Sequence, residues 1–180
     1  MALKSNLWKL SMITDKLIVN LRDPRQQLIS FYHYIDFLSI RVNFTGLMQY
    51  QIPDGYFLWS MEKKLNWQIE NHCVPVNIQW IKSWLEADKD PDFLCEILFC
   101  QHETLAKEPK KYFQKILSFY GIPEDKFIFP LLPKFGEKNY FKLRKGSIDE
   151  WSKILTSEQI QKINNSIPED WFQKFSWNKT

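Results

Sequence analysis

The chain has 180 residues, a length that suits one domain, so we expect a single domain over residues 1–180. Hydrophobic residues make up 44% of the chain and aromatic residues 16%, which excludes a disordered protein, and the net charge of +3 is too small to indicate nucleic-acid binding by itself. Because there is no apolar run of 18 residues, no signal-peptide pattern and only three cysteines, we expect a reduced, cytoplasmic protein without a membrane segment.

The first predicted element is a strand over residues 17–21, a short apolar run typical of strands that are buried on both faces. Asp23 and Pro24 follow it, and they suit the N-cap and the first turn of a helix. The spacing of apolar side chains predicts that this helix runs over residues 24–41.

Arg22 therefore lies at the carboxyl end of a strand and beside a helix N-terminus, a place where α/β proteins bind anions. Ser30 follows eight residues later, and a guanidinium with a hydroxyl makes a candidate phosphate site. An alternative of equal weight on this segment alone is that Arg22 pairs with Asp23 or caps a neighbouring helix, and that Ser30 is an ordinary helix residue.

The remaining predicted elements continue an alternation of helices and strands, with an irregular, aromatic-rich stretch over residues 42–75. We expect further helices over residues 56–70, 77–87, 110–120 and 156–167, and a second buried strand over residues 93–100. Gly121 is expected to stop the third of these helices, and Thr156 with Gln159 predicts a capping box at the start of the fourth.

A second candidate site segment lies near the C-terminus, where Arg144 and Lys145 precede Gly146. A glycine lets the backbone approach a ligand closely, although a solvated basic turn is the more common meaning of such a tripeptide alone. Together with the Arg22–Ser30 segment, it resembles the sulfotransferases that use 3′-phosphoadenosine 5′-phosphosulfate (PAPS). That family carries an R-[DN]-P-[RK]-D-x-x-x-S segment and a late R-K-G segment, followed by G-D-W.

The resemblance implies that five residues hold the 3′-phosphate of PAPS, the co-substrate: Arg22, Ser30, Arg144, Lys145 and Gly146. Two positions depart from the pattern, since Gln26 replaces the family's Asp and residues 149–151 read Asp-Glu-Trp in place of G-D-W. His102 stands where the family has a tyrosine that lies near the adenine.

The implied fold class is α/β, with a parallel sheet flanked by helices in the nucleotide-kinase-like (P-loop NTPase-like) sulfotransferase arrangement. The resemblance covers only the later part of the family's domain, because the sequence contains no P-K-[ST]-G-T-[TS]-W loop, so we expect an N-terminally incomplete fold. Lys4 to Leu7 is similar to the family's K-[ST]-H-[LV] segment, with Asn6 in place of the histidine that removes the acceptor's proton. Asparagine cannot act as a general base.

The resemblance implies a sulfotransferase that moves a sulfuryl group from PAPS to a hydroxyl or amine of a small-molecule or glycan acceptor. The alternative is a catalytically inactive module that binds 3′-phosphoadenosine nucleotides or a partner. We expect no nucleic-acid or membrane partner, and either an oligomer or an upstream chain that completes the sheet. We expect no metal site, because Cys95 and Cys100 face opposite sides of a strand.

Overall fold

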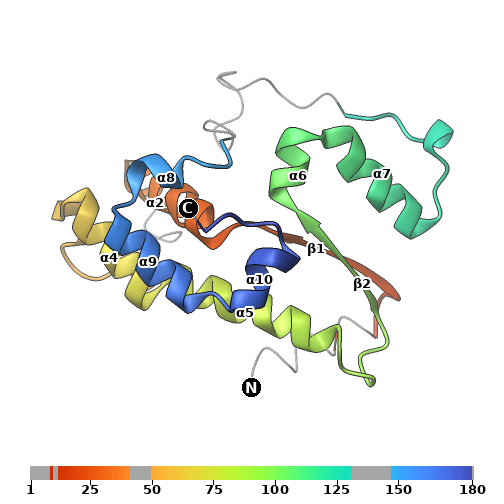
Figure 1. Cartoon of the computed structure of the whole chain (residues 1–180), viewed down its shortest axis with the longest axis horizontal. Helices are drawn as coiled ribbons and strands as arrows, with labels where there is room; N and C mark the ends of the chain where they lie inside the picture. Colours follow the sequence, from red (N-terminus) through yellow and green to blue (C-terminus); the bar gives the residue numbers. More distant parts are fainter. Residues whose placement is uncertain (1–8, 10–11, 41–49, 131–146, 180) are drawn as a thin grey trace. The chain divides into compact units, whose positions relative to one another are not determined.

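The computed structural model describes residues 9, 12–40, 50–130 and 147–179 of the chain. These residues fall into two compact units. Unit 1 comprises Met1–Arg22 and Gln79–Ile148, and unit 2 comprises Asp23–Ile78 and Asp149–Thr180. The described elements, labelled in part in Figure 1, are β1 (Lys16–Leu21), α2 (Pro24–Ile40), η1 (Tyr56–Leu58), α4 (Met61–Asn71), α5 (Cys73–Ala87), β2 (Glu96–Gln101), α6 (His102–Lys107), α7 (Pro109–Tyr120), η2 (Glu124–Lys126), α8 (Trp151–Ile154), α9 (Ser157–Ser166) and α10 (Glu169–Lys174).

Unit 1 is built on β1 and β2, which are parallel and are the two strands of the sheet in the described part of the chain. Their register runs from Lys16 opposite Glu96 to Leu21 opposite Gln101. Parallel strands need a long connection, and here it includes α5. This confirms the expected α/β fold class and the position of the first predicted strand. The strand is not buried on both faces as its apolar run predicts, because Val19 and Leu21 are buried whereas Asn20, on the opposite face, is exposed.

The second strand begins later than its apolar run predicts, at Glu96 instead of Phe93. Phe93 still belongs to a turn, because its backbone N–H donates to the carbonyl of Asp90. The side chains of Phe93 and Cys95 are nevertheless buried, and they pack in a small core with Ala87, Leu17, Trp84 and Ile97. The apolar pattern predicted too long a strand because these residues are buried without pairing to β1.

Two helices follow β2 in unit 1 (Figure 1). The sequence did not reveal α6, which starts directly after the strand, whereas α7 confirms the helix predicted over residues 110–120. The predicted stop is also confirmed, since Gly121 has a left-handed φ of 66° and its N–H donates to the carbonyl of Ser118 at 3.1 Å. Lys115 ties α7 to the sheet, because its Nζ donates to the carbonyl of Phe99 at 2.7 Å.

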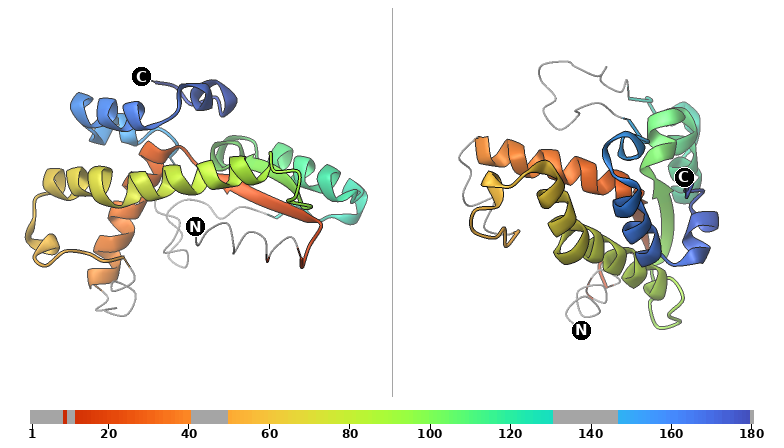
Figure 2. Two further views of the ribbon diagram at one scale, coloured as in Figure 1. Left: turned by 90° about the horizontal axis from the view of Figure 1, so that it is seen from below. Right: turned by 60° about the vertical axis from the view of Figure 1, so that its left-hand side comes forward.

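Unit 2 is helical, and its longest helix, α2, contacts α4, α8 and α9 (Figure 2). The helix confirms the prediction for residues 24–41 to within one residue and buries Leu28, Ile29 and Ile35 completely. Further along α2, Ile35 and Leu38 pack with Tyr56 in a core that is rich in aromatic side chains. The partly buried members of that core are Phe31, Tyr34, Phe37, Tyr50, Ile52, Trp59 and Trp67.

The helix predicted over residues 56–70 is divided in two, a 3₁₀ turn and α4. Ser60 separates them because its side chain caps α4 by accepting the backbone N–H of Lys63 at 3.3 Å. The next helix, α5, begins four residues earlier than expected, since Pro75 lies in its first turn, where a missing N–H costs no hydrogen bond. At α9 the predicted capping box of Thr156 and Gln159 is confirmed.

Candidate functional site

Arg22 lies directly after β1, and His102 directly after β2. The residues that precede them, Leu21 and Gln101, are partners in the parallel register, so Arg22 and His102 leave the same carboxyl edge of the sheet next to each other. Both residues are half-buried and belong to unit 1. The carboxyl edge of a parallel sheet is where α/β proteins bind their ligands, and this edge therefore holds the candidate site.

The electrostatics of this edge favour an anion. Burial, and after it the positive charge of Arg22, lowers the pKa of His102 from its ordinary 6.5 to about 4. The imidazole is therefore neutral at physiological pH, and the positive charge of the nearby guanidinium acts on it. A phosphate at this edge would meet the positive charge of Arg22, and the neutral imidazole of His102 adds no negative charge that would repel it, so the described residues fit the 3′-phosphate that the resemblance implies.

Ser30 lies in α2 of unit 2 and is half-buried, and Arg22 lies in unit 1. The predicted cap of α2 is confirmed, because the Oδ1 of Asp23 accepts the backbone N–H of Arg25 at 2.9 Å. The first turn of α2 thus already has a carboxylate on one of its N–H groups. The anion site is better assigned to the Arg22 side chain than to this helix terminus.

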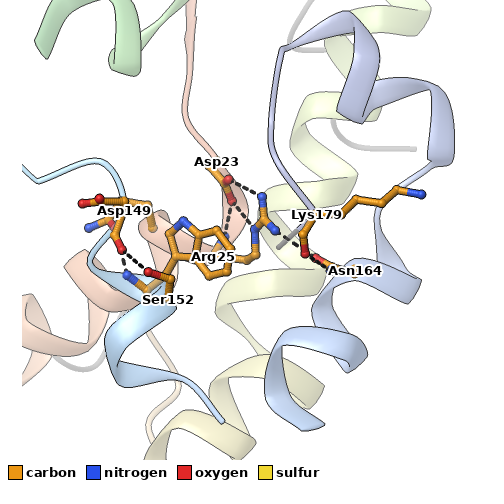
Figure 3. Close-up of polar contacts among 8 residues, drawn as sticks. Asp23, Arg25, Asp149, Ser152, Asn164 and Lys179 are labelled. Atoms are coloured by element: carbon orange, nitrogen blue, oxygen red, sulfur yellow. Dashed lines mark hydrogen bonds and ion pairs between the residues drawn. The ribbon is translucent and has the colours of Figure 1, made fainter. Parts of the chain in front are cut away.

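The carboxylate of Asp23 is held by Arg25 in a buried ion pair, which Figure 3 shows. The Nε of Arg25 donates to Oδ1 at 3.0 Å and its Nη2 donates to Oδ2 at 2.6 Å, so the pair is bidentate. The remaining Nη1 donates to the side-chain oxygen of Asn164 in α9 at 3.2 Å. Arg25 is 0% exposed, and every one of these partners lies in unit 2.

Aromatic rings and an amide complete this cluster. The guanidinium of Arg25 lies 3.9 Å from the ring centroid of Trp151 and 5.6 Å from that of Phe172. Gln26, which is 1% exposed, accepts the backbone N–H of Trp151 at 3.3 Å. The start of α2 is thereby fixed to α8, the helix that follows the Arg144–Gly146 segment along the chain.

Sequence reasoning missed this cluster, although it contained one usable signal. An acidic and a basic residue flank Pro24 at the start of a helix, and side chains at those positions reach each other readily. The contribution of Trp151, Phe172 and Asn164 had no such signal, because each lies more than a hundred residues away in the sequence. Asn6, Arg144, Lys145 and Gly146 lie outside the described residues, and their expected roles stay predictions.

A second aromatic group surrounds His72, within the stretch of residues 42–75 that the sequence shows to be rich in aromatic side chains. The imidazole stacks on Phe31 with 5.4 Å between ring centroids and on Trp67 with 5.8 Å. Tyr50 meets the same ring edge-on at 6.1 Å. Burial lowers the pKa of His72, so a neutral, apolar surface results here rather than a charged one.

Two general properties of the described part of the chain bear on its chemistry. None of the helices there is both long and apolar enough to cross a membrane. Within the same residues, no group of three or more histidine, cysteine, aspartate or glutamate side chains is placed to hold a metal ion.

Comparisons with known proteins agree with the architecture. A family model described as "Sulfotransferase domain" matches residues 2–176. No curated protein and no solved structure gave a significant match. Because the family model spans nearly the whole chain, and the fold places an arginine at the carboxyl edge of a parallel sheet, the chain belongs to the sulfotransferase domain family.

Proposed function

We propose that the chain binds PAPS as its sulfuryl donor and directs the sulfuryl group to a hydroxyl or amine of a small-molecule or glycan acceptor. Arg22 and Ser30 bind the 3′-phosphate, together with Arg144, Lys145 and the backbone at Gly146. The observation that carries this proposal is the position of Arg22, at the carboxyl edge of β1 in a chain of the sulfotransferase family.

The side chains proposed to bind the 3′-phosphate have the chemistry that suits a phosphate monoester. Such a group carries nearly two negative charges at neutral pH, and a planar guanidinium can donate two parallel hydrogen bonds to it. The bound nucleotide supplies the sulfuryl group, and the residues of this chain bind and orient it. Because the phosphate-binding residues come from two distant segments of the chain, the affinity for the nucleotide depends on both segments.

Asn6 favours a second candidate function, a module that binds the nucleotide without catalysing transfer. The resemblance places Asn6 where the family has its general base, and an amide cannot accept the acceptor's proton. Loss of a positioned base lowers a rate by roughly 10²–10⁴-fold. This candidate retains the same nucleotide site and differs from the first only in the chemical step.

Calorimetry with 3′,5′-ADP and 5′-AMP tests the proposed nucleotide site. Charge-assisted contacts contribute about 1.5–3 kcal/mol each, so we expect 3′,5′-ADP to bind more than about tenfold more tightly. Arg22→Ala and Arg144→Ala should each remove most of this preference. Lys82→Ala is the matched control, because Lys82 is an exposed cation of unit 1 whose partner is Glu86 in the next turn. Equal affinities of the unaltered chain for the two nucleotides would refute the proposal.

A transfer assay separates the two candidate functions. Labelled PAPS is incubated with a panel of phenols, alcohols, amines and glycans, and labelled products are counted. Sulfated product that depends on Arg22 supports the enzyme, whereas nucleotide binding without product supports the binding module. Asn6→His is the decisive variant, because restored or increased turnover would place residue 6 at the position of the base.

We also propose a cytoplasmic location. The chain has three cysteines, Cys73, Cys95 and Cys100, and all of them are buried free thiols in the structure. Free thiols persist in a reducing compartment. Fractionation of cells that produce the protein tests this assignment, and recovery with secreted or membrane fractions would contradict it.

A further inference from the structure

We propose that His102 is a further phosphate-binding residue, which takes up a proton from solvent when the 3′-phosphate binds beside Arg22 and then donates a charged N–H to it. This inference rests on the proposed function, and it concerns the regulation of the same site by pH. The resemblance places a tyrosine near the adenine at this position, and a tyrosine does not change its charge near neutral pH, so a phosphate-binding role for His102 goes beyond the family pattern.

The geometry that supports the proposal is contained in unit 1. The register of β1 and β2 pairs Leu21 with Gln101, so the next residues, Arg22 and His102, lie at one edge of the sheet. Both side chains are half-buried, and the charge of Arg22 acts on the imidazole of His102, so a phosphate held by Arg22 lies within electrostatic range of His102. His102 is also the first residue of α6, where its side chain is held by an ordered backbone.

The electrostatic argument concerns which charges His102 meets. In the free protein, burial and the charge of Arg22 both act against protonation of the imidazole. A phosphate with nearly two negative charges next to Arg22 reverses the sign of the local charge. An anion within a few ångströms raises the pKa of a histidine by about 1–3 units, so the protonated form becomes populated under mildly acidic conditions.

Other charged side chains lie on the elements around His102, and several of them have partners of their own. On β1 and β2, Lys16 pairs with Glu96 at 3.4 Å at the amino ends of the strands, opposite to the candidate site. On α7, Lys115 donates to the carbonyl of Phe99 and Lys111 pairs with Glu108. The charged residues of α6 are Glu103 and Lys107, and α7 also carries Lys110. Of all these side chains, Arg22 is the charge that shifts the pKa of His102.

Proton NMR of the histidine rings gives the direct test. The chain has three histidines, His33, His72 and His102, and His102→Gln assigns the relevant resonance. We expect the pKa of His102 to rise by about one unit or more when the full chain is saturated with 3′,5′-ADP. Saturation with 5′-AMP, which lacks the 3′-phosphate, should leave it unchanged.

The pH dependence of nucleotide affinity gives an independent measure. If the pKa of His102 rises from about 4 to about 6, the affinity for 3′,5′-ADP gains about tenfold between pH 7 and pH 5 from this residue. The phosphates of the ligand also titrate in this range and work against binding at low pH. The gain is therefore taken as the ratio of the unaltered chain to His102→Gln, in which the ligand's own contribution cancels.

His72→Gln is the matched control, because His72 is also partly buried with a lowered pKa but belongs to unit 2. It should leave the tenfold gain intact, while His102→Gln and His102→Tyr remove it. Far-ultraviolet circular dichroism establishes that each variant is folded before titration. If the unaltered chain prefers 3′,5′-ADP but shows the same pH dependence as His102→Gln, the role of His102 is overturned and the proposed function stands. If it shows no preference for 3′,5′-ADP, both fall together.

Discussion

Replacement of Arg25 by methionine is expected to destabilise the protein by about 3–5 kcal/mol, because it leaves a buried carboxylate without its counter-ion. The side chains of Arg25 and Asp23 are 0% and 5% exposed, and the pair has two direct hydrogen bonds. Methionine retains much of the length of the side chain and its contact with Trp151, so lost charge pairing accounts for most of the effect. With a total stability of about 5–15 kcal/mol, the variant should retain only a small margin.

A double-mutant cycle separates the ion pair from the helix cap. Asp23→Asn keeps a good capping residue but leaves the buried charge of Arg25 without its carboxylate, so this variant should also lose about 3–5 kcal/mol of stability. The double variant removes both buried charges, and its cost should be well below the sum of the two single costs. Lys64→Met, which breaks the less buried pair with Asp36 in the same unit, provides the comparison and should cost less.

Urea unfolding followed by tryptophan fluorescence measures these free energies, and the chain has eight tryptophans as reporters. Additive costs in the cycle, or a loss below about 1 kcal/mol for either single variant, would show that the two charges are not coupled. The reasoning from their burial and geometry would then be wrong.

Three further measurements follow from the structure. The free energy of unfolding should fall by about 1–2 kcal/mol as the pH drops from about 6.5 to 4, because His102 binds a proton more readily in the unfolded chain than in the folded one, where its pKa is about 4. Urea titrations should show a weaker fall in His102→Gln, and identical curves for the two proteins would contradict this. Gly121→Ala should cost about 1 kcal/mol in thermal unfolding through backbone strain alone, since φ is 66° and no atom lies within 4 Å of the added Cβ. Each described strand has a sheet neighbour on one side within the described residues, so the isolated chain should self-associate in light scattering, and a stable monomer would refute this.

The sequence predicted those parts of the fold that depend on local patterns. Apolar periodicity found α2 and α7, and the glycine at 121 marked a helix end because only a left-handed residue fits there. Apolar periodicity failed where residues are buried without pairing to a neighbouring strand, since Phe93 and Cys95 are buried before β2 begins. Short helices such as α8 are stabilised by tertiary contacts, which no local pattern encodes.

The candidate site was predicted in part for the same reason. Arg22 is recognisable because the end of an apolar run is visible in the sequence, and its position at the carboxyl edge is confirmed by the structure. Its proximity to His102 depends on which strands pair and in which register, and this follows from the packing of the whole unit. The partners of Arg25 were unpredictable for a similar reason, since Trp151 and Asn164 approach it only after folding.

The division of unit 2 into two stretches of chain has a consequence for synthesis on the ribosome. Its helices α2 and α4 are made early, whereas Trp151, Ile163 and Phe172, which are buried in the finished unit, come from the last thirty or so residues. Arg25 and its partner Asp23 are synthesised well before Trp151 and Phe172, whose rings contact the guanidinium of Arg25 in the folded unit. Unit 2 therefore completes its core only after its second stretch, Asp149–Thr180, has been synthesised, and until then the apolar faces of α2 and α4 lack the side chains that cover them.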